Sequence, residues 1–155
     1  MIVTLLAGMA MATARVEKAN AVTRNITLYG SASLGWGFTS TSITSPGPQL
    51  SFDVGDVINM TLVSEDGLPH LFFIDYNGNQ SPDAGEPQSP TFTTTINYQF
   101  IVNQTGTPMY YCYIHPSVMF GNTSIIPEFS TLLVVPLFMM ATLLAVIAYR
   151  RKRQL

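Results

Sequence analysis

Cysteine and histidine are scarce in this 155-residue chain, which has one cysteine and two histidines. A lone cysteine, Cys112, cannot form an intramolecular disulfide, so the sequence excludes a small domain held together by disulfide bonds. With only His70 and His115 available, and no acid paired with a nucleophile, nothing resembles a catalytic arrangement. We therefore expect a protein that is not an enzyme.

Basic residues are absent from the middle of the chain. Between Asn25 and Phe129 there is no lysine or arginine. The same segment holds eight acids: Asp53, Asp56, Glu65, Asp66, Asp75, Asp83, Glu86 and Glu128. A surface of this charge repels nucleic acid and attracts cationic partners. We exclude binding to DNA or RNA, and expect partners that dock through a basic face or through an apolar one.

The two ends of the chain are apolar. Residues 130–149 form a run of 20 mostly apolar residues, long enough to cross a bilayer, and residues 150–155 begin with four bases. By the positive-inside rule the basic tail stays in the cytoplasm and the preceding domain lies outside the cell. We predict a single-pass protein of the cell membrane, with residues 126–129 as the linker and residues 130–149 as a transmembrane helix.

The N-terminal residues 1–21 resemble the end of a secretory signal. An apolar stretch is followed by two small-residue patterns typical of cleavage sites, Ala12-Thr13-Ala14 and Ala19-Asn20-Ala21. A plain N-terminal membrane anchor is the alternative.

The middle of the chain shows no helical apolar period. Short runs rich in β-forming residues alternate with turn residues, the pattern of an all-β sandwich. We predict a domain over residues 25–125 with strands near 26–29, 33–38, 49–54, 57–63, 70–74, 91–95, 98–102 and 109–112.

Four residues supply a distinctive set of metal ligands. Cys112 is followed by His115 and then by Met119, and His70 lies 42 residues before Cys112. One thiolate, two imidazoles and one thioether are the ligand set of a mononuclear blue copper site. Zinc is the alternative for the same residues, although Met119 would then have no role. A binuclear copper centre of the oxidase type is excluded because it needs a second cysteine.

The order His, Cys, His, Met, with the last three on one loop after a tyrosine-rich strand, resembles the cupredoxin or type 1 blue copper family, and plastocyanin and amicyanin in particular. The resemblance implies a Greek-key β-sandwich that transfers one electron at a time. It implies His70, Cys112 and His115 as equatorial ligands, Met119 as the axial ligand and the edge of His115 as the electron port.

Two residues depart from the family pattern. Three residues separate His115 from Met119, whereas plastocyanin has four and amicyanin two. Leu71 stands where family members often have an asparagine that braces the cysteine loop. Another group must therefore brace that loop, or the loop is looser.

We therefore predict a membrane-tethered, extracytoplasmic copper protein that carries electrons between redox partners. Copper storage, delivery or sensing is the alternative, and an adhesion or coat domain with a structural metal is a third hypothesis.

A second loop has the oxygen-ligand spacing of an EF-hand calcium loop. Its candidate ligands are Asp75, Asn77, Asn79, Ser81, Asp83 and Glu86. Position 6 of such a loop should be glycine for the sharp turn, but here it is Gln80, and no helices flank the segment. An acidic, solvated turn is the interpretation we favour, and calcium is the alternative.

Two further motifs concern export. Sequons for N-glycosylation, which fit glycans on turns of an exported domain, occur at Asn25, Asn59, Asn103 and Asn122. The residues Ile126-Pro127-Glu128-Phe129, followed by the apolar run and the bases, resemble the PEF-type sorting signal of archaea, whose tail is removed at the membrane.

Overall fold

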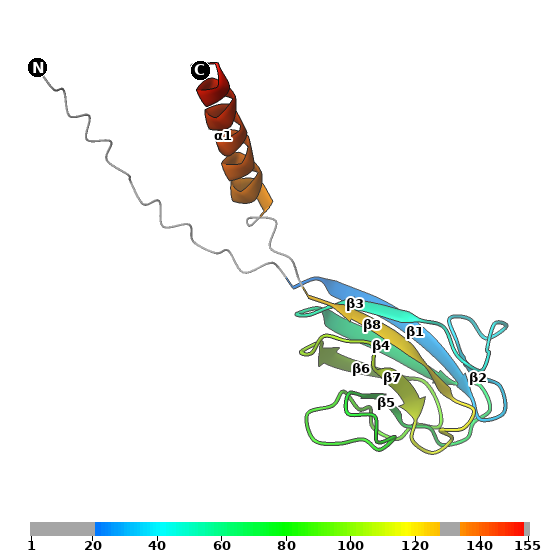
Figure 1. Cartoon of the computed structure of the whole chain (residues 1–155). Coiled ribbons are helices and arrows are strands. Elements are labelled where there is room, and N and C mark those ends of the chain that lie inside the picture. Colours follow the sequence, from blue (N-terminus) through cyan, green and yellow to red (C-terminus); the bar gives the residue numbers. More distant parts are fainter. Residues whose placement is uncertain (1–20, 128–133, 154–155) are drawn as a thin grey trace, which may run out of the picture. The chain divides into compact units, whose positions relative to one another are not determined.

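The computed structural model describes residues 21–127 and 134–153 (Figure 1). The chain divides into two units, a domain of Asn20–Glu128 and a second unit that includes the C-terminal helix. Residues 1–20 of the predicted signal-like segment (residues 1–21) and residues 128 and 129 of the predicted linker (residues 126–129) lie outside the described residues.

The first sheet of the domain contains four strands in the order β2-β1-β4-β6. Strands β1 and β4 are parallel, and the other two pairs are antiparallel. The bounds are β1 Thr23–Ser31, β2 Gly35–Gly37, β4 Val57–Ser64 and β6 Ile96–Ile101. The apolar residues of β4 alternate with polar ones, so Ile58, Met60 and Leu62 are buried while the residues between them are partly exposed.

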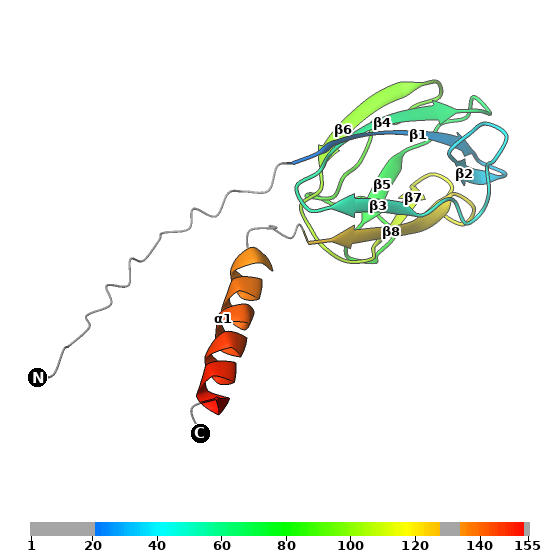
Figure 2. The ribbon, with the colours of Figure 1, turned by 90° about the horizontal axis from the view of Figure 1, so that it is seen from above.

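The second sheet also contains four strands, in the order β3-β8-β7-β5. Strands β3 and β8 are parallel, whereas β8 with β7 and β7 with β5 are antiparallel. The bounds are β3 Leu50–Asp53, β5 Phe72–Asp75, β7 Met109–Cys112 and β8 Phe120–Ile126. Figure 2 shows the two sheets as separate layers. The predicted all-β sandwich is therefore confirmed.

The core lies between the two layers and is rich in aromatic side chains. Trp36, Phe52, Phe72 and Tyr110 are almost fully buried in it. Phe52 meets Phe100 edge to face across the sheets, with ring centroids 6.1 Å apart. Such pairs add to the stability that burial of their apolar area provides. Cys112 and Met119 belong to the same buried cluster, so the core packs directly against the segment that follows β7.

Some strand predictions were wrong. Residues 91–95 form no strand, and only Phe92 makes an isolated bridge, to His70. The strand expected over residues 70–74 begins at Phe72. Strand β8 was missed because its buried positions are Gly121, Thr123 and Ile125, which give little apolar alternation.

Arg24 modifies the charge of the domain. It lies in β1 and pairs with Asp53 and with Asp56, whose side chain is 3% exposed. This base stands just outside the range used for the charge prediction. The folded domain therefore combines one base, already paired, with eight acids, and its strongly acidic character is kept.

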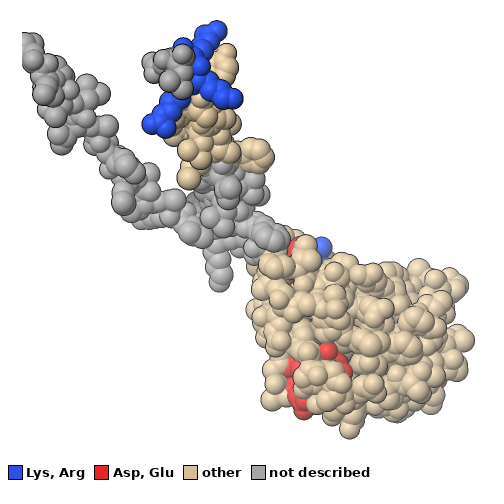
Figure 3. All heavy atoms as spheres, in the orientation of Figure 1, with Lys and Arg blue, Asp and Glu red and all other residues tan. Residues whose placement is uncertain are grey.

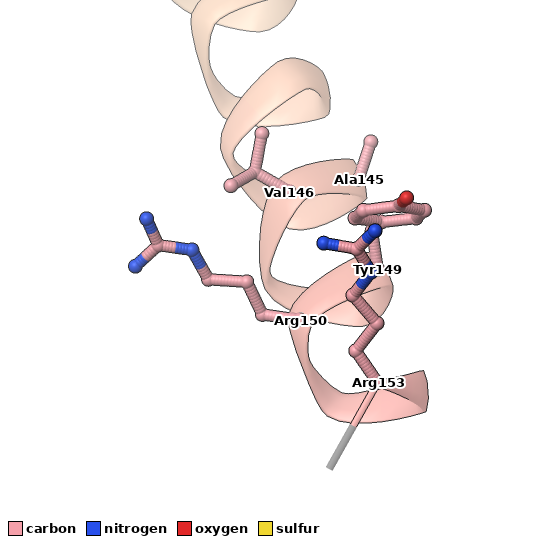
Figure 4. Close-up of a pocket in the computed structure, with 5 residues that line it drawn as sticks. All are labelled: Ala145, Val146, Tyr149, Arg150 and Arg153. Carbon is pink, nitrogen blue, oxygen red and sulfur yellow. The ribbon is translucent and has the colours of Figure 1, made fainter.

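The second unit contains helix α1, Val134–Lys152. Lysine and arginine side chains gather at its C-terminal end (Figure 3), where Arg153 lies over the ring of Tyr149 at 5.6 Å from the centroid (Figure 4). Within residues 21–127 and 134–153, no helix is long and apolar enough to span a bilayer. The transmembrane helix predicted over residues 130–149 is therefore not found among the described residues, and residues 130–133 of that prediction are not described.

Candidate metal centre

Backbone pairing brings two of the predicted donors, His70 and Cys112, together. Cys112 is the last residue of β7, where it pairs with Phe72 of β5. His70 lies two residues before β5 and is fixed by a bridge to Phe92, with N–O distances of 2.8 and 2.9 Å in the two directions. Because β5 and β7 are neighbours, His70, which precedes β5, lies close to Cys112, which ends β7.

The three side chains converge on one point. Nδ1 of His70 and Nδ1 of His115 each lie 3.7 Å from Sγ of Cys112. One donor atom from each of the three residues lies within 4.8 Å of the others. His70 and Cys112 are fully buried, whereas His115 is partly exposed. A thiolate and two imidazoles at these separations can share one metal ion, and the predicted grouping of these residues is confirmed.

The loop from Cys112 to Met119 is closed by its own backbone. The amide of His115 donates to the carbonyl of Cys112, and the amide of Met119 donates to the carbonyl of His115 at 2.9 Å. The amide of Cys112 in turn donates to the carbonyl of Met119 at 2.8 Å. The three-residue spacing between His115 and Met119 therefore forms one compact turn that returns Met119 beside the start of the loop.

Neighbouring segments brace this loop without the asparagine of the family pattern. The amide of Tyr113 donates to the carbonyl of Leu71 at 2.9 Å. The Ser45 hydroxyl donates to the carbonyl of Val118 at 2.6 Å. Leu71 thus braces the cysteine loop through its backbone, which needs no particular side chain. Of the two alternatives that the sequence left open, the structure therefore supports bracing by another group.

Met119 is fully buried, as an axial ligand should be. A Cβ added to Gly30 would lie 2.8 Å from Cε of Met119 and 2.7 Å from Cζ3 of Trp36. The methionine side chain is thus held against β1 and the indole ring. Its axial role stays a prediction.

The surroundings favour the thiolate at Cys112. Burial by itself would raise the pKa of this thiol, but hydrogen bonding with His70 and with backbone amides such as that of Leu71 outweighs burial and lowers it. Burial likewise opposes charge on His70, yet hydrogen bonds to Cys112 and Asp66 raise its pKa. Burial and the nearby charge of His70 lower the pKa of His115. The thiolate is the form that binds metals, so the site suits a cation.

Asp66 is a site residue that the sequence analysis missed. Nε2 of His70, on the far side of the ring from Cys112, lies 2.9 Å from a carboxylate oxygen of Asp66. Metal-binding histidines commonly donate their second N–H to such a group. The only signal in the sequence is an acid four residues before the histidine, which is too common a spacing to single out.

The predicted calcium loop forms one connected turn, but no contact in it identifies a cation. Asp75 accepts the amides of Gly78 and Gln80, and Asp83 accepts the side-chain amides of Asn77 and Asn79. Gln80 adopts a φ of 60°, so the sharp turn expected of glycine is made here without one. Calcium binding by Asp75, Asn77, Asn79, Ser81, Asp83 and Glu86 stays a prediction.

The sequons lie mainly on strands rather than on the expected turns. Asn25 of β1 stands opposite Asn59 of β4, and the Asn59 amide donates to the Asn25 side chain at 3.1 Å. Asn122 is exposed on β8, and only Asn103 lies outside the strands. Glycosylation of these four residues stays a prediction.

No family model matches the chain, and no curated protein matches it. Solved structures do. Auracyanin A, a "blue" copper protein from the green thermophilic photosynthetic bacterium Chloroflexus aurantiacus, has a TM-score of 0.52 at 15% identity, covering 66% of this chain and 98% of that one. Reduced rusticyanin also has a TM-score of 0.52, at 16% identity, covering 68% and 81%.

The class that this fold and site define is therefore a cupredoxin-like β-sandwich with a candidate metal centre where β7 ends, formed with a residue that precedes β5. The donors fit one copper ion of type 1. The thiol of Cys112 and the imidazoles of His70 and His115 lie close enough to share a metal, and the buried thioether of Met119 follows on the same loop. His70, Cys112, His115 and Met119 make up that site.

Proposed function

We propose that this protein transfers single electrons between redox partners and catalyses no reaction of its own. The observation that carries the proposal is a buried Cys112 thiol between two imidazoles, of which only that of His115 reaches the surface. Copper bound there would supply the exchangeable electron. The partly exposed His115 ring would give that electron a short path to the surface, while His70 and Cys112 stay shielded from water.

The frame around the donors supports fast exchange. His70 is fixed by its bridge to Phe92, and Cys112 by its place in β7. Packed cores resist displacement, so the ligands keep nearly the same positions in both oxidation states. A protein of this kind loses little energy to rearrangement when an electron arrives or leaves.

Absorption spectroscopy tests the copper site. The protein loaded with Cu(II) should be intensely blue or green because of charge transfer from the thiolate, and Cys112→Ser should abolish the colour. Colour that survives this substitution would sink the proposal. The rate of electron self-exchange then separates a carrier from a protein for storage, delivery or sensing, because only a carrier must exchange quickly.

We further propose that the domain lies outside the cell and is tethered to the membrane by the apolar C-terminal segment. Support comes from the exposed apolar side chains of α1, such as Phe138 and Leu144, and from the bases that follow them. Membrane fractionation of cells tests the tether. Mass spectrometry of the mature protein tests the sorting hypothesis: an intact Leu155 would rule out removal of the tail.

A further inference from the structure

Asp66 joins the turn after β1 to the connection between β4 and β5, to which Asp66 itself, Leu68 and His70 belong. Its carboxylate accepts the amide of Ala32 from the turn after β1 at 2.6 Å, and the amide of Leu68 from its own connection at 3.1 Å. It also accepts Nε2–H of His70 at 2.9 Å. Two backbone amides and the Ser64 hydroxyl, which donates at 3.2 Å, therefore hold the carboxylate in place beside the histidine.

This arrangement fixes the orientation of the His70 ring. Nε2 is bound to Asp66, which directs Nδ1 toward Cys112 at 3.7 Å. The ring is fully buried, so turning it away would leave a buried N–H without a partner. Asp66 therefore acts on the metal through His70.

The carboxylate also brings a negative charge close to the site, on the far side of the His70 ring. Four groups hydrogen-bond to it, the amides of Ala32 and Leu68, the Ser64 hydroxyl and Nε2–H of His70, and all four are donors, which matches the ionised form. Arg24, the one base within residues 21–127, is already paired with Asp53 and Asp56. The Asp66 side chain is 23% exposed, so water screens its charge in part.

We propose that Asp66 is the residue that positions His70 and lowers the reduction potential of the copper site by favouring Cu(II) over Cu(I). This inference rests on the proposed copper function. A negative charge beside a copper ligand stabilises the doubly charged ion more than the singly charged one. One electron from a partner converts Cu(II) to Cu(I), and Asp66 neither gains nor loses a proton in that step.

The decisive experiment compares Asp66→Asn with the wild type and with Glu65→Gln in the full-length, copper-loaded protein. In the first variant the asparagine side chain can still accept from His70 through its amide oxygen but carries no charge. Glu65→Gln removes a charge from the adjacent, exposed residue, which the structure does not join to His70. The readouts are the reduction potential and the separate affinities for Cu(II) and Cu(I).

We expect Asp66→Asn to lower the ratio of Cu(II) to Cu(I) affinity about tenfold, which raises the potential by about 59 mV for a one-electron couple. Loss of the group that holds a metal-binding histidine costs on the order of 10–100-fold in metal affinity, so the size is reasonable for a partly exposed group. Glu65→Gln should leave the ratio nearly unchanged. Because each ratio compares two ions in one folded protein, a general loss of stability cancels.

A conservative variant separates charge from fold. Asp66→Glu keeps the charge and should keep the ratio within about threefold of the wild type, even if the longer side chain weakens both affinities. The melting temperature of the metal-free protein measures the structural cost of each variant. The inference is overturned if the reduction potential of Asp66→Asn stays at the wild-type value, or if that of Glu65→Gln rises by the same amount. In either case a blue wild-type protein still supports the copper function. A colourless wild type refutes the function itself.

Discussion

At the scale of single residues, Tyr110 links the core to the segment that precedes β3. Its hydroxyl donates to the carbonyl of Pro48 at 2.6 Å, and its ring lies beside Phe72 with centroids 5.7 Å apart. Burial raises the pKa of this phenol above its ordinary value near 10. Ionisation is thus disfavoured in the folded state.

The pH dependence of stability follows from this shift. Since the folded pKa lies above the unfolded one, the contribution of Tyr110 is complete below about pH 10 and is lost as the pH rises through the folded value. Tyr110→Phe should lower the unfolding free energy at pH 7 by about 1 kcal/mol and reduce the alkaline loss of stability. Denaturant titrations of the metal-free protein between pH 7 and 11 measure both effects. Tyr113→Phe, at an exposed ring, is the control, and an equal change there would contradict the prediction.

Gly30 gives a second prediction, on the side of the site where Met119 lies. Its added Cβ would meet Cζ3 of Trp36 at 2.7 Å and Cε of Met119 at 2.8 Å. Gly30→Ala should therefore cost about 1–3 kcal/mol by overpacking and should also shift the visible spectrum, because Met119 must move. Thermal melts and absorption spectra of the copper-loaded protein check this.

Gly106→Ala is the matched control for that substitution. Gly106 has a φ of +134°, and only Pro108 comes within 4 Å of an added Cβ. Alanine there should cost stability through backbone strain and leave the copper spectrum unchanged. A spectrum unchanged in Gly30→Ala would mean that Met119 does not control the colour.

The ligands could be predicted from single residues, whereas the residue that orients one of them could not. Cys112 and the two histidines are rare side chains, so their spacing carries information. Asp66 is one of eight acids in its domain, and nothing local marks it. Its role depends on the turn at Ala32, which the pairing of β1 with β4 brings close to Asp66.

At the scale of elements, the connection between β2 and β3 braces the copper loop. The Ser45 hydroxyl reaches the carbonyl of Val118, and the amide of Gly47 reaches the carbonyl of Phe120 at 2.7 Å. Ser45→Ala should cost about 1 kcal/mol and speed the loss of copper to a chelator several-fold. Stopped-flow release with a coloured chelator measures the rate.

Ser117→Ala tests whether the effect belongs to that contact. Ser117 lies in the same loop, is exposed, and makes no side-chain hydrogen bond within the described residues. Removal of the Ser117 hydroxyl should leave the rate of copper loss to the chelator unchanged. Equal acceleration in both variants would show that any change in the loop loosens the metal.

The elements themselves were predictable where side chains alternate by polarity and hidden where they do not. Strand β4 alternates clearly and was predicted within a residue of its end. Strand β8 buries Gly121 beside the Tyr110 ring, which a Cβ added at Gly121 would overlap, and its next buried residue is the polar Thr123. Such a strand is defined by its neighbour rather than by its own pattern.

At the scale of the whole molecule, the metal should contribute substantially to stability. A ligand at about a thousand times its dissociation constant adds about 4 kcal/mol, which for a domain of this size raises the melting temperature by about 10 °C or more. Calorimetry of residues 21–127 with and without copper tests this and also tests whether the domain folds without its tail. Cys112→Ser is the control and should show little stabilisation by copper.

The acidic domain should also choose its redox partners by charge. The domain contains eight acids and one base, so the electrostatic potential around it is negative. A small cationic oxidant should therefore react with the reduced protein faster than an anionic oxidant of similar potential, and the difference should shrink as salt rises.

Apolar docking is the alternative to docking by charge. Exposed apolar side chains such as Ile114 and Tyr113 adjoin His115 in the chain and favour docking through the loop from His115 to Val118 and Phe120. Stopped-flow rates measured from low to high ionic strength distinguish docking by charge from apolar docking. Rates that do not change with salt for either oxidant would favour apolar docking.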